Sequence, residues 1–311
     1  MSRSPHPLDS HEDRGAARNG RTNRFDFDLP TKSRTAQQRE IADDHPFVSD
    51  RSERTRRVPE HVDSARAHYI GERAYFLRDS EFETLAEVGT FRIIAAPDLA
   101  RLSYAGDTAR MEREIRRLKQ QALLSEKQSA AERNKPSRLL ALTKQGARLL
   151  RKSGRVPDGQ AIYHGFAKPR EAKHDADLYR LYQAEAERIE SAGGRPVRVV
   201  LDYELKRNLN RDLEALHESG RPLEVLDEIA ERHGLSVVNG KIPVPDLRIE
   251  YDTAEMERQR VDLELATRNY RPRALAEKAK AGFSLYARHE DSSRLRRVLE
   301  DREITATILS L

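Results

Sequence analysis

Residues 80–152 constrain the fold more than any other stretch, because signals for helix starts and stops follow one another there in close order. Ser80 is a favourable N-cap, and Gly89 is expected to end the helix that Ser80 begins. Pro97 suits the first turn of a second, short helix, which should close near Gly106. The stretch therefore opens with two closely spaced helices.

A longer third helix is expected directly after these two. Residues 107–120 place Met111, Ile115 and Leu118 on one apolar stripe, which is typical of a helix packed on a core. Two strands joined by a polar loop and one more helix follow, at residues 123–127, 138–143 and 144–152. Helix, short helix, longer helix, two-stranded hairpin and helix is the order of a winged helix-turn-helix domain.

The segment Leu142–Leu150, with the sequence LTKQGARLL, supports this interpretation. It resembles the strand-to-helix segment that follows the wing in MarR-type and related repressors. The resemblance implies a DNA-binding domain, which we place at residues 61–155. Its first part, residues 62–69, is expected to form a helical or loosely packed lead-in.

Positive charge is concentrated in this predicted domain. The whole chain has a net charge of +5, yet residues 107–155 alone hold 14 Lys and Arg against 5 Asp and Glu. One basic segment in an otherwise balanced chain is typical of contact with a polyanion such as DNA. The alternative is a solvated helical face used for protein contact, since Glu112 and Glu114 lie among the arginines.

The third helix would be the recognition helix, which lies in the major groove with its N-terminal residues at the base edges. Its arginines at spacing i, i+3 and i+7 share the outer face, where arginine binds guanine or phosphate. The loop between the two strands would be a wing that touches the DNA backbone or the minor groove. The candidate DNA contacts are therefore Thr108, Arg110, Arg113, Arg117, Arg133, Lys135 and Arg138.

Residues 1–60 differ from the rest of the chain. They hold 12 basic and 11 acidic residues and show no apolar periodicity. Such a segment buries too little apolar area to offset its ordering entropy. We therefore expect a disordered tail at residues 1–60.

The composition excludes several classes of protein. The chain has no Cys, which excludes disulfides, a Cys-ligated zinc finger, an iron–sulfur cluster and thiol catalysis. Its longest apolar runs, such as residues 93–96, fall far short of the ~20 residues that span a bilayer. The first residues lack the apolar stretch of a secretion signal. A soluble, cytoplasmic protein without membrane contact is expected.

Beyond residue 160, strand-like and helical segments alternate. Strands are predicted at residues 197–201, 235–238, 244–251, 260–266, 283–287 and 304–309. Helices are predicted at residues 175–189, 274–280 and 293–299, and within residues 208–234. Strands interleaved with helices indicate an α/β domain with a mixed sheet, at residues 160–311. The expected fold class of the chain is therefore mixed α+β.

Two acidic residues in neighbouring predicted strands carry the sharpest chemical signal. Asp246 follows Pro245 where one strand begins, and Glu264 lies within the next. This pair resembles the acidic pair of the PD-(D/E)XK nucleases. The resemblance implies a Mg²⁺ site in which carboxylates from adjacent strands hold the ion, which polarises the scissile phosphate and activates water.

The sequence departs from that nuclease pattern at one position. The lysine expected two residues after Glu264, which orients water and stabilises developing charge, is replaced by Ala266. Lys278 or Lys280 from the following helix could take its place. Otherwise the domain has lost its catalytic activity, Asp246 caps a turn and Glu264 pairs with an arginine.

Further polar residues have candidate roles in this domain. Glu204, together with Glu185 or Glu187, could complete the acidic cluster. His174 is expected to cap a helix start rather than bind a metal, because no other histidine lies nearby. Tyr270 is expected to pack in the fold rather than stack on a base.

As a whole, residues 80–311 resemble the replication-relaxation family. Its members join a winged helix to a nuclease-like α/β domain and are common on plasmids and other mobile elements. The resemblance is carried by Leu142–Leu150, His174, Val244-Pro245-Asp246, Asp262-Leu263-Glu264 and the segment Lys278–Tyr286 with Gly282.

These observations predict a DNA-binding protein without enzymatic activity, whose winged helix docks on double-stranded DNA. The nuclease-like domain would mediate homodimer, partner or nucleic-acid contact in a transcriptional regulator or a replication or mobilisation accessory. The first alternative is a Mg²⁺-dependent DNA endonuclease that uses Asp246 and Glu264 as metal ligands. Lys278 or Lys280 would then orient the attacking water. Without this activity, no cofactor is expected. The second alternative is a protein-interaction adaptor whose basic face binds an acidic partner.

Overall fold

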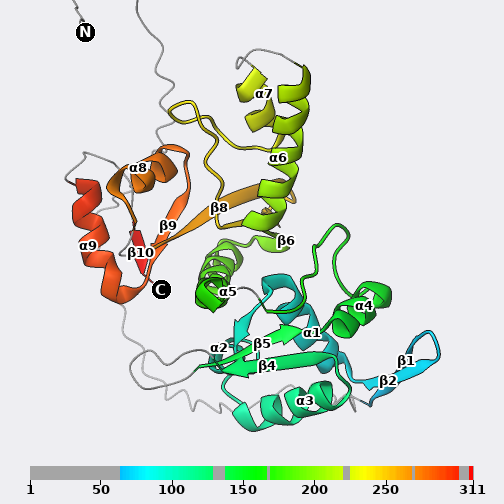
Figure 1. Ribbon diagram of the computed structural model, residues 1–311. Coiled ribbons are helices and arrows are strands. Elements are labelled where there is room, and N and C mark those ends of the chain that lie inside the picture. Colours follow the sequence, from blue (N-terminus) through cyan, green and yellow to red (C-terminus); the bar gives the residue numbers. More distant parts are fainter. Residues whose placement is uncertain are drawn as a thin grey trace, which may run out of the picture. The chain divides into compact units, whose positions relative to one another are not determined.

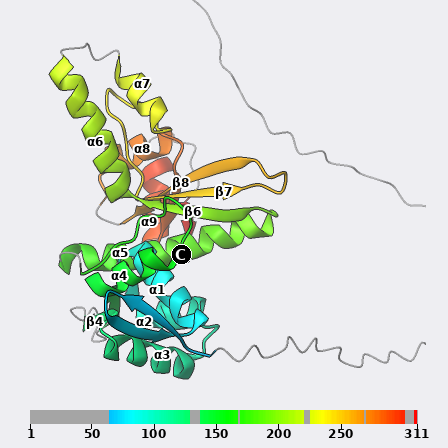
Figure 2. The same ribbon diagram turned by 90° about the vertical axis from the view of Figure 1, so that its right-hand side faces the viewer.

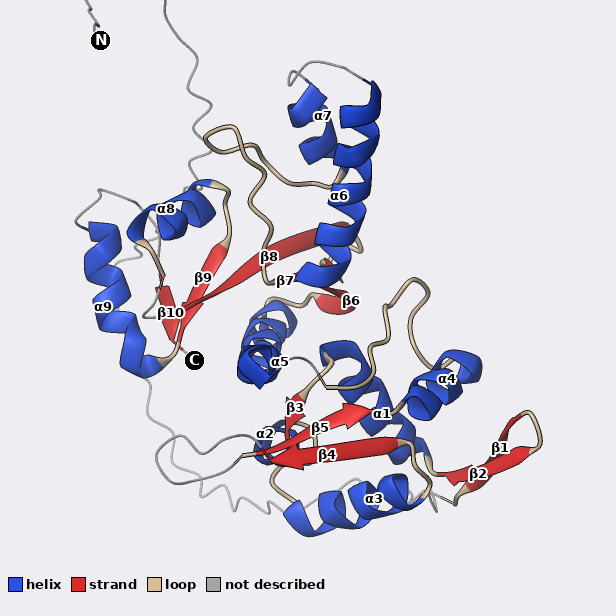
Figure 3. Ribbon diagram, viewed as in Figure 1, coloured by secondary structure: helices blue, strands red, loops and turns tan. Residues whose placement is uncertain are grey.

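The computed structural model describes residues 64–128, 137–166, 169–219, 225–267, 270–300 and 308–310. These residues form helices, a three-stranded sheet, a five-stranded sheet and a two-stranded hairpin (Figure 1, Figure 3). The mixed α+β class predicted from the sequence is thereby confirmed. The predicted tail and the predicted wing residues Arg133 and Lys135 lie outside the described residues.

The first half of the described chain has the winged-helix order. Its helices are α1 (Asp79–Phe91), α2 (Ala96–Leu102), α3 (Thr108–Gln120) and α4 (Lys144–Ser153). Its antiparallel sheet has the order β3-β5-β4, from β3 (Ile94–Ala95), β4 (Leu124–Gln128) and β5 (Arg138–Leu142). The helix α3 begins where predicted because the Asp107 side chain accepts a hydrogen bond from the N–H of Arg110. Its apolar stripe of Met111, Ile115 and Leu118 is buried.

The predicted helical or loose lead-in is wrong. The chain instead forms an antiparallel hairpin of β1 (Arg66–Ile70) and β2 (Arg73–Leu77). Its inner face buries Ile70, Tyr75 and Leu77 in the core. The hairpin forms because these apolar residues alternate with others at the spacing of a half-buried strand.

The helix α1 runs past Gly89, so the expected end of this helix is also wrong. Gly89 is buried within α1, and a Cβ atom there would lie 2.8 Å from Cδ1 of Leu142 and 3.1 Å from Cγ2 of Ile162. The glycine therefore allows α1 to approach β5 closely. The helix begins after Arg78, whose N–H donates a 2.9 Å hydrogen bond to Glu81, rather than at the predicted serine.

The second half is built on the five-stranded sheet. Its strands are β6 (Arg195–Leu201), β7 (Leu247–Asp252), β8 (Arg258–Ala266), β9 (Ser284–Ala287) and β10 (Ile308–Ser310). They lie in the order β10-β9-β8-β7-β6, antiparallel from β6 to β8 and parallel from β8 to β10. The predicted mixed sheet is confirmed. The strand predicted at residues 235–238 is reduced to an isolated bridge between Val238 and Lys241.

In the described part of this half, five helices accompany the sheet. They are α5 (Pro169–Ser191), α6 (Asp202–Ser219), α7 (Val225–Arg232), α8 (Pro272–Lys280) and α9 (His289–Glu300). Leu275 of α8 and Leu295 of α9 belong to one buried cluster with residues of β8, β9 and β10. The helices α8 and α9 thereby pack at the end of the sheet formed by β9 and β10 (Figure 1).

The helix α5 lies between the two sheets, as Figure 1 and Figure 2 show from two directions. It contacts β6 of the larger sheet and β3 of the smaller one. Leu178 and Tyr179 of α5 belong to one hydrophobic core that also contains Phe91 of α1 and Leu263 of β8. The two halves therefore share a core, and α5 fixes one against the other.

Candidate functional site

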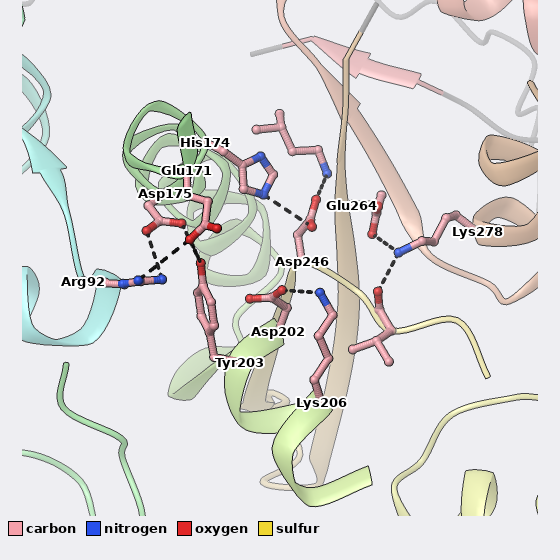
Figure 4. Close-up of polar contacts among 12 residues, drawn as sticks. Arg92, Glu171, His174, Asp175, Asp202, Tyr203, Lys206, Asp246, Glu264 and Lys278 are labelled. Carbon is pink, nitrogen blue, oxygen red and sulfur yellow. Dashed lines mark hydrogen bonds and ion pairs between the residues drawn. The ribbon is translucent and has the colours of Figure 1, made fainter. Parts of the chain in front are cut away.

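The strand register brings the predicted acidic pair together. The strands β7 and β8 are antiparallel neighbours in which Leu247 pairs with Leu263. Asp246 precedes β7 and therefore comes opposite Glu264 in β8. Oδ2 of Asp246 accepts a 2.9 Å hydrogen bond from the N–H of Leu265. Glu264 is fully buried and Asp246 mostly so, and the two carboxyl groups lie side by side (Figure 4).

Lys278 reaches this acidic pair from α8. Its Nζ donates hydrogen bonds to Oε2 of Glu264 at 2.9 Å and to the carbonyl oxygen of Val244 at 2.6 Å. Lys280 is exposed at the end of the same helix. Of the two lysines that the sequence leaves open, the structure brings Lys278 to the site. Glu264 is thus paired with a lysine, and not with an arginine.

Burial and charge set the protonation of the pair. Burial raises the pKa of Glu264 to about 7, the charge of Asp246 adds to the rise, and the ammonium of Lys278 opposes it. Burial also acts to raise the pKa of Asp246, but hydrogen bonds and charge from His174, with the N–H of Leu265, outweigh it and lower that pKa. Asp246 therefore carries the negative charge of the pair near neutral pH, while Glu264 shares the site partly protonated.

His174 of α5 belongs to the site as well, a role that the sequence does not predict. Its Nε2 lies 3.4 Å from Oδ1 of Asp246. Burial lowers the pKa of His174, but the hydrogen bond and charge of Asp246 outweigh burial and raise it. The helix begins at Pro169, so His174 lies inside α5 and the predicted capping role is wrong. Only the packing of α5 on the sheet unites His174 with Asp246, so no local signal could reveal it.

Tyr270 also contacts the acidic pair. Tyr270 packs against a buried cluster, as the sequence predicts, and its hydroxyl also donates a hydrogen bond to Oε1 of Glu264. Both oxygens of Glu264 are therefore engaged, one by Tyr270 and one by Lys278.

A polar cluster next to His174 connects the site to α1. Arg92, which follows α1, lies 3.4 Å from Oδ2 of Asp175 and 4.3 Å from the ring centroid of Tyr203. The Tyr203 hydroxyl donates to Asp175 and Glu171, each at 3.4 Å. Burial raises the pKa of Asp175 to about 6, against the charge of Arg92. His174 of α5 thus faces the acidic pair, whereas the next residue, Asp175, faces Arg92 of the winged-helix half (Figure 4).

The other carboxylates suggested by the sequence do not join the site. Glu204 is hydrogen-bonded to Arg198, and Glu185 accepts a hydrogen bond from Tyr286. Glu187 is exposed. In the described residues, no group of three or more His, Asp or Glu side chains is arranged to hold a metal ion. The candidate ligands for a cation therefore remain the acidic pair.

The predicted DNA contacts on α3 are in part neutralised within the protein. Nε of Arg110 lies 3.1 Å from Glu114, and Nε of Arg117 lies 2.6 Å from Glu81. Arg113 is exposed and makes no ion pair with the described residues, and Thr108 is exposed at the start of the helix. Arg113 is therefore the arginine of the predicted set that is most available to DNA.

Arg138 is held even more firmly. Its Nε lies 2.9 Å from Glu126, and its Nη1 donates a hydrogen bond to Glu112. The hydrogen bonds from Arg138 and Lys119 lower the pKa of Glu126 to about 2. Arg138 therefore joins the start of β5 to β4 and α3, and its charge is largely compensated.

A cavity on the same face adds an arginine that the sequence did not single out. It has a volume of about 270 Å³ and is lined by Arg78, Arg110, Arg113, Glu114 and Arg117. Four cations against one carboxylate make this cavity attractive to phosphate. Arg78 precedes α1 and reaches this face through the packing of α1 against α3. Because Arg78 is far from the α3 arginines in the sequence, the sequence does not reveal that it joins them.

No known protein family matches the chain, and no curated protein is similar enough to its sequence to be counted as a relative. Within the described part of the chain, none of the helices combines the length and the apolar character needed to cross a membrane.

Proposed function

We propose that the protein is a metal-dependent DNA nuclease that its own winged helix directs to duplex DNA. The observation that carries this proposal is the contact of Lys278 with Glu264, because it supplies the positive charge that Ala266 does not. Two carboxylates and a lysine from three parts of the chain then meet at one point, where they would supply metal ligands and a positive charge for the hydrolysis of a phosphodiester.

The acidic pair fits a divalent cation. The antiparallel register of β7 and β8 puts Asp246 opposite Glu264, so both carboxylates could contact one ion. Mg²⁺ is commonly bound by one or two carboxylates, with water and substrate phosphate as its other ligands. Asp246 and Glu264 would hold the ion, which when bound polarises the scissile phosphate and lowers the pKa of water.

The side chains around the pair would position the reacting groups. Lys278 brings a positive charge into a buried site, where it stabilises negative charge that develops on the phosphate. Its hydrogen bond to the carbonyl oxygen of Val244 fixes the ammonium group. His174 holds Asp246 from α5, so it acts as a positioning residue.

The basic face of α3 would hold the duplex. Arg113 has no ion pair in the described residues and lines the arginine-rich cavity, which suits a backbone phosphate. Thr108 lies at the N-terminal end of α3, the end that reaches base edges in a helix-turn-helix. Arg110 and Arg117 share their charge with carboxylates and therefore contribute less.

Incubation of the purified protein with supercoiled plasmid tests the proposal. The wild-type protein should cut the plasmid with Mg²⁺ or Mn²⁺ and fail to cut it in EDTA. Asp246→Asn should abolish cutting and still shift the plasmid in a gel, whereas Asp227→Asn, at an exposed position of α7, should cut normally. Cutting by Asp246→Asn at the wild-type rate would overturn the assignment.

A second candidate function is DNA binding without cleavage. The small number of metal-binding side chains at the site favours it. The described residues offer two carboxylates rather than a group of three or more donors. The protein would then be a cytoplasmic transcriptional regulator or a replication or mobilisation accessory, as its resemblance to the replication-relaxation family implies, and its second half would mediate homodimer or partner contact. A plasmid shift without cutting in either metal would select this function. A lack of plasmid affinity at physiological salt would select the protein-interaction adaptor.

A further inference from the structure

The β1–β2 hairpin has an apolar outer face that the core does not use. On its inner face, Tyr75 and Leu77 are each 1% exposed, whereas Tyr69 and Phe76 are 58% and 59% exposed. In the described part of the chain, the other large hydrophobic side chain with such exposure is Met256. The solvated face of an antiparallel sheet ordinarily carries polar side chains. Two exposed rings on this small hairpin therefore indicate a binding surface.

The strand register puts both rings on the same surface. Tyr69 pairs with Ala74, and Phe76 pairs with Ala67, so these four side chains form one face. The rings occupy diagonal positions, at which Cα atoms lie about 7 Å apart. Alanine is too small to shield them. We call this surface, made of Ala67, Tyr69, Ala74 and Phe76, the aromatic face.

Positive charge lies on the hairpin and beside it. Lys152 of α4 donates a 3.1 Å hydrogen bond to the carbonyl oxygen of Tyr69, whereas Arg66 and Arg73 are exposed on the opposite side of the hairpin, where they pair with Leu77 and Ile70. Glu72 in the turn is the acidic residue of the hairpin. Cations beside exposed rings complement a nucleic acid, whose phosphates are negative and whose bases have flat faces. Lys152 therefore favours a nucleic acid over a second copy of the chain, which would bring the same cation to this surface.

The hairpin is fixed to one end of the predicted recognition helix. Gln121, which follows α3, accepts a 2.8 Å hydrogen bond from the N–H of Phe76 and donates a 3.0 Å hydrogen bond to its carbonyl oxygen. Nη2 of Arg73 donates to the carbonyl oxygen of Gln121 at 3.3 Å. Figure 1 shows the hairpin beyond this end of α3. DNA that lies along α3 would therefore extend toward the hairpin.

We propose that the aromatic face stacks on unpaired bases next to the duplex that α3 holds, so that the preferred substrate is a junction of double-stranded and single-stranded DNA. This inference rests on the DNA-binding part of the proposed function. Bases within a duplex already stack on one another, whereas an unpaired base offers its face to Tyr69 or Phe76. Such stacking tolerates any sequence because every base has a π-face.

Fluorescence anisotropy in EDTA tests the inference without cleavage. The probes are a blunt duplex and the same duplex with a short unpaired extension on either strand. Wild-type protein should bind one of the extended duplexes about tenfold more tightly than the blunt one. The double variant Tyr69→Ser/Phe76→Ser should lose that gain and keep its affinity for the blunt duplex.

Two further variants control for folding and for surface apolarity. The double variant Tyr69→Phe/Phe76→Tyr keeps both rings and should keep the gain. Met256→Ser removes an exposed hydrophobic side chain from the turn between β7 and β8 and should also keep it. Melting temperatures equal to that of the wild type show that the variants fold.

Equal wild-type affinity for blunt and extended duplexes overturns the inference, as does a gain that persists in Tyr69→Ser/Phe76→Ser. A double variant that changes the oligomeric state and not the affinity for extended DNA also overturns it, because a second copy would then cover the aromatic face. Failure of the proposed function gives a different result. If the protein binds DNA but cannot cut it, it still binds the extended duplex more tightly than the blunt one. If it cannot bind DNA, it shows no affinity for either duplex.

Discussion

Nζ of Lys278 lies 2.9 Å from Oε2 of Glu264, although the lysine comes from α8 and the glutamate from β8. The positive charge therefore enters the site from a helix rather than from the strand position that the nuclease resemblance implies. The carbonyl oxygen of Val244 fixes the same ammonium group at 2.6 Å. The site thus depends on the packing of α8 as well as on the register of β7 and β8.

The free energy of unfolding should depend on Glu264 between about pH 4.5 and pH 7. Burial, with the charge of Asp246, raises the pKa of Glu264 to about 7. In that pH range the native state keeps a proton that the unfolded state has released, so stability falls as the pH rises, by about 3 kcal/mol for such a shift. Urea unfolding in EDTA should show this loss in the wild type, and Glu264→Gln should remove it. Parallel pH curves for the two proteins would contradict the raised pKa.

Mg²⁺ should stabilise the wild-type protein above neutral pH, where Glu264 is charged. A ligand that binds only the native state raises the melting temperature, and above its dissociation constant the stabilisation grows with the logarithm of the ligand concentration. Asp246→Asn removes one carboxylate charge and should melt at the same temperature with and without Mg²⁺, whereas Asp227→Asn should respond like the wild type. A response of Asp246→Asn equal to that of the wild type would place the ion elsewhere.

Arg113 and Arg117 should respond differently to removal. Arg113→Ala should weaken duplex binding and reduce its salt slope by about 1 without loss of stability, because Arg113 is exposed. Arg117→Ala should lower the free energy of unfolding by about 1–3 kcal/mol, because it leaves the buried carboxylate of Glu81 unpaired. Filter binding in a salt series and urea unfolding separate the two effects. Unchanged duplex affinity in Arg113→Ala would remove α3 from the DNA interface.

Gly146 in α4 should not tolerate a side chain. A Cβ atom there would lie 2.1 Å from the carbonyl oxygen of Leu123. Replacing glycine by alanine in an exposed helix stabilises by about 1 kcal/mol, but overpacking against a backbone atom costs about 1–3 kcal/mol or more. The clash should therefore prevail, and Gly146→Ala should unfold at a lower urea concentration than the wild type. Lys144→Ala, at an exposed position of the same helix, should not. A higher midpoint for Gly146→Ala would contradict the close approach of α4 to Leu123.

The winged-helix half could be predicted because its signals are local. The Asp107 cap and the stripe of Met111, Ile115 and Leu118 act within α3 itself. The sequence does not reveal the β1–β2 hairpin, because its alternation of apolar and polar residues is short and the exposed face carries the apolar residues Tyr69 and Phe76. Gly89 resembles a helix end in the sequence, but its small size serves packing against β5, which the residues of α1 alone do not reveal.

The acidic pair could be predicted because one strand register places Asp246 opposite Glu264. The choice between Lys278 and Lys280 depends on how α8 packs, which the sequence does not fix. Ala266 is fully buried in a cluster with Leu275 of α8, so a lysine at position 266 would enter the core. The helix that covers Ala266 thus also supplies the lysine.

The partners of the other site residues are long-range as well. His174 meets Asp246 only through the packing of α5 on the sheet. Arg117 pairs with Glu81, a residue of another helix. Each such pair joins two elements whose relative position depends on the shared core. The amino-acid sequence alone does not give the distance between those elements.

Single-turnover cleavage of a duplex in Mn²⁺ tests most directly whether Lys278 provides the charge that Ala266 lacks. Lys278→Ala should lower the cleavage rate about 100-fold or more with unchanged DNA affinity, as for removal of one group that stabilises developing charge. Lys280→Ala, at the exposed end of the same helix, should cut at the wild-type rate. Lys278→Ala cutting as fast as the wild type, or the loss appearing in Lys280→Ala instead, would contradict the proposed site.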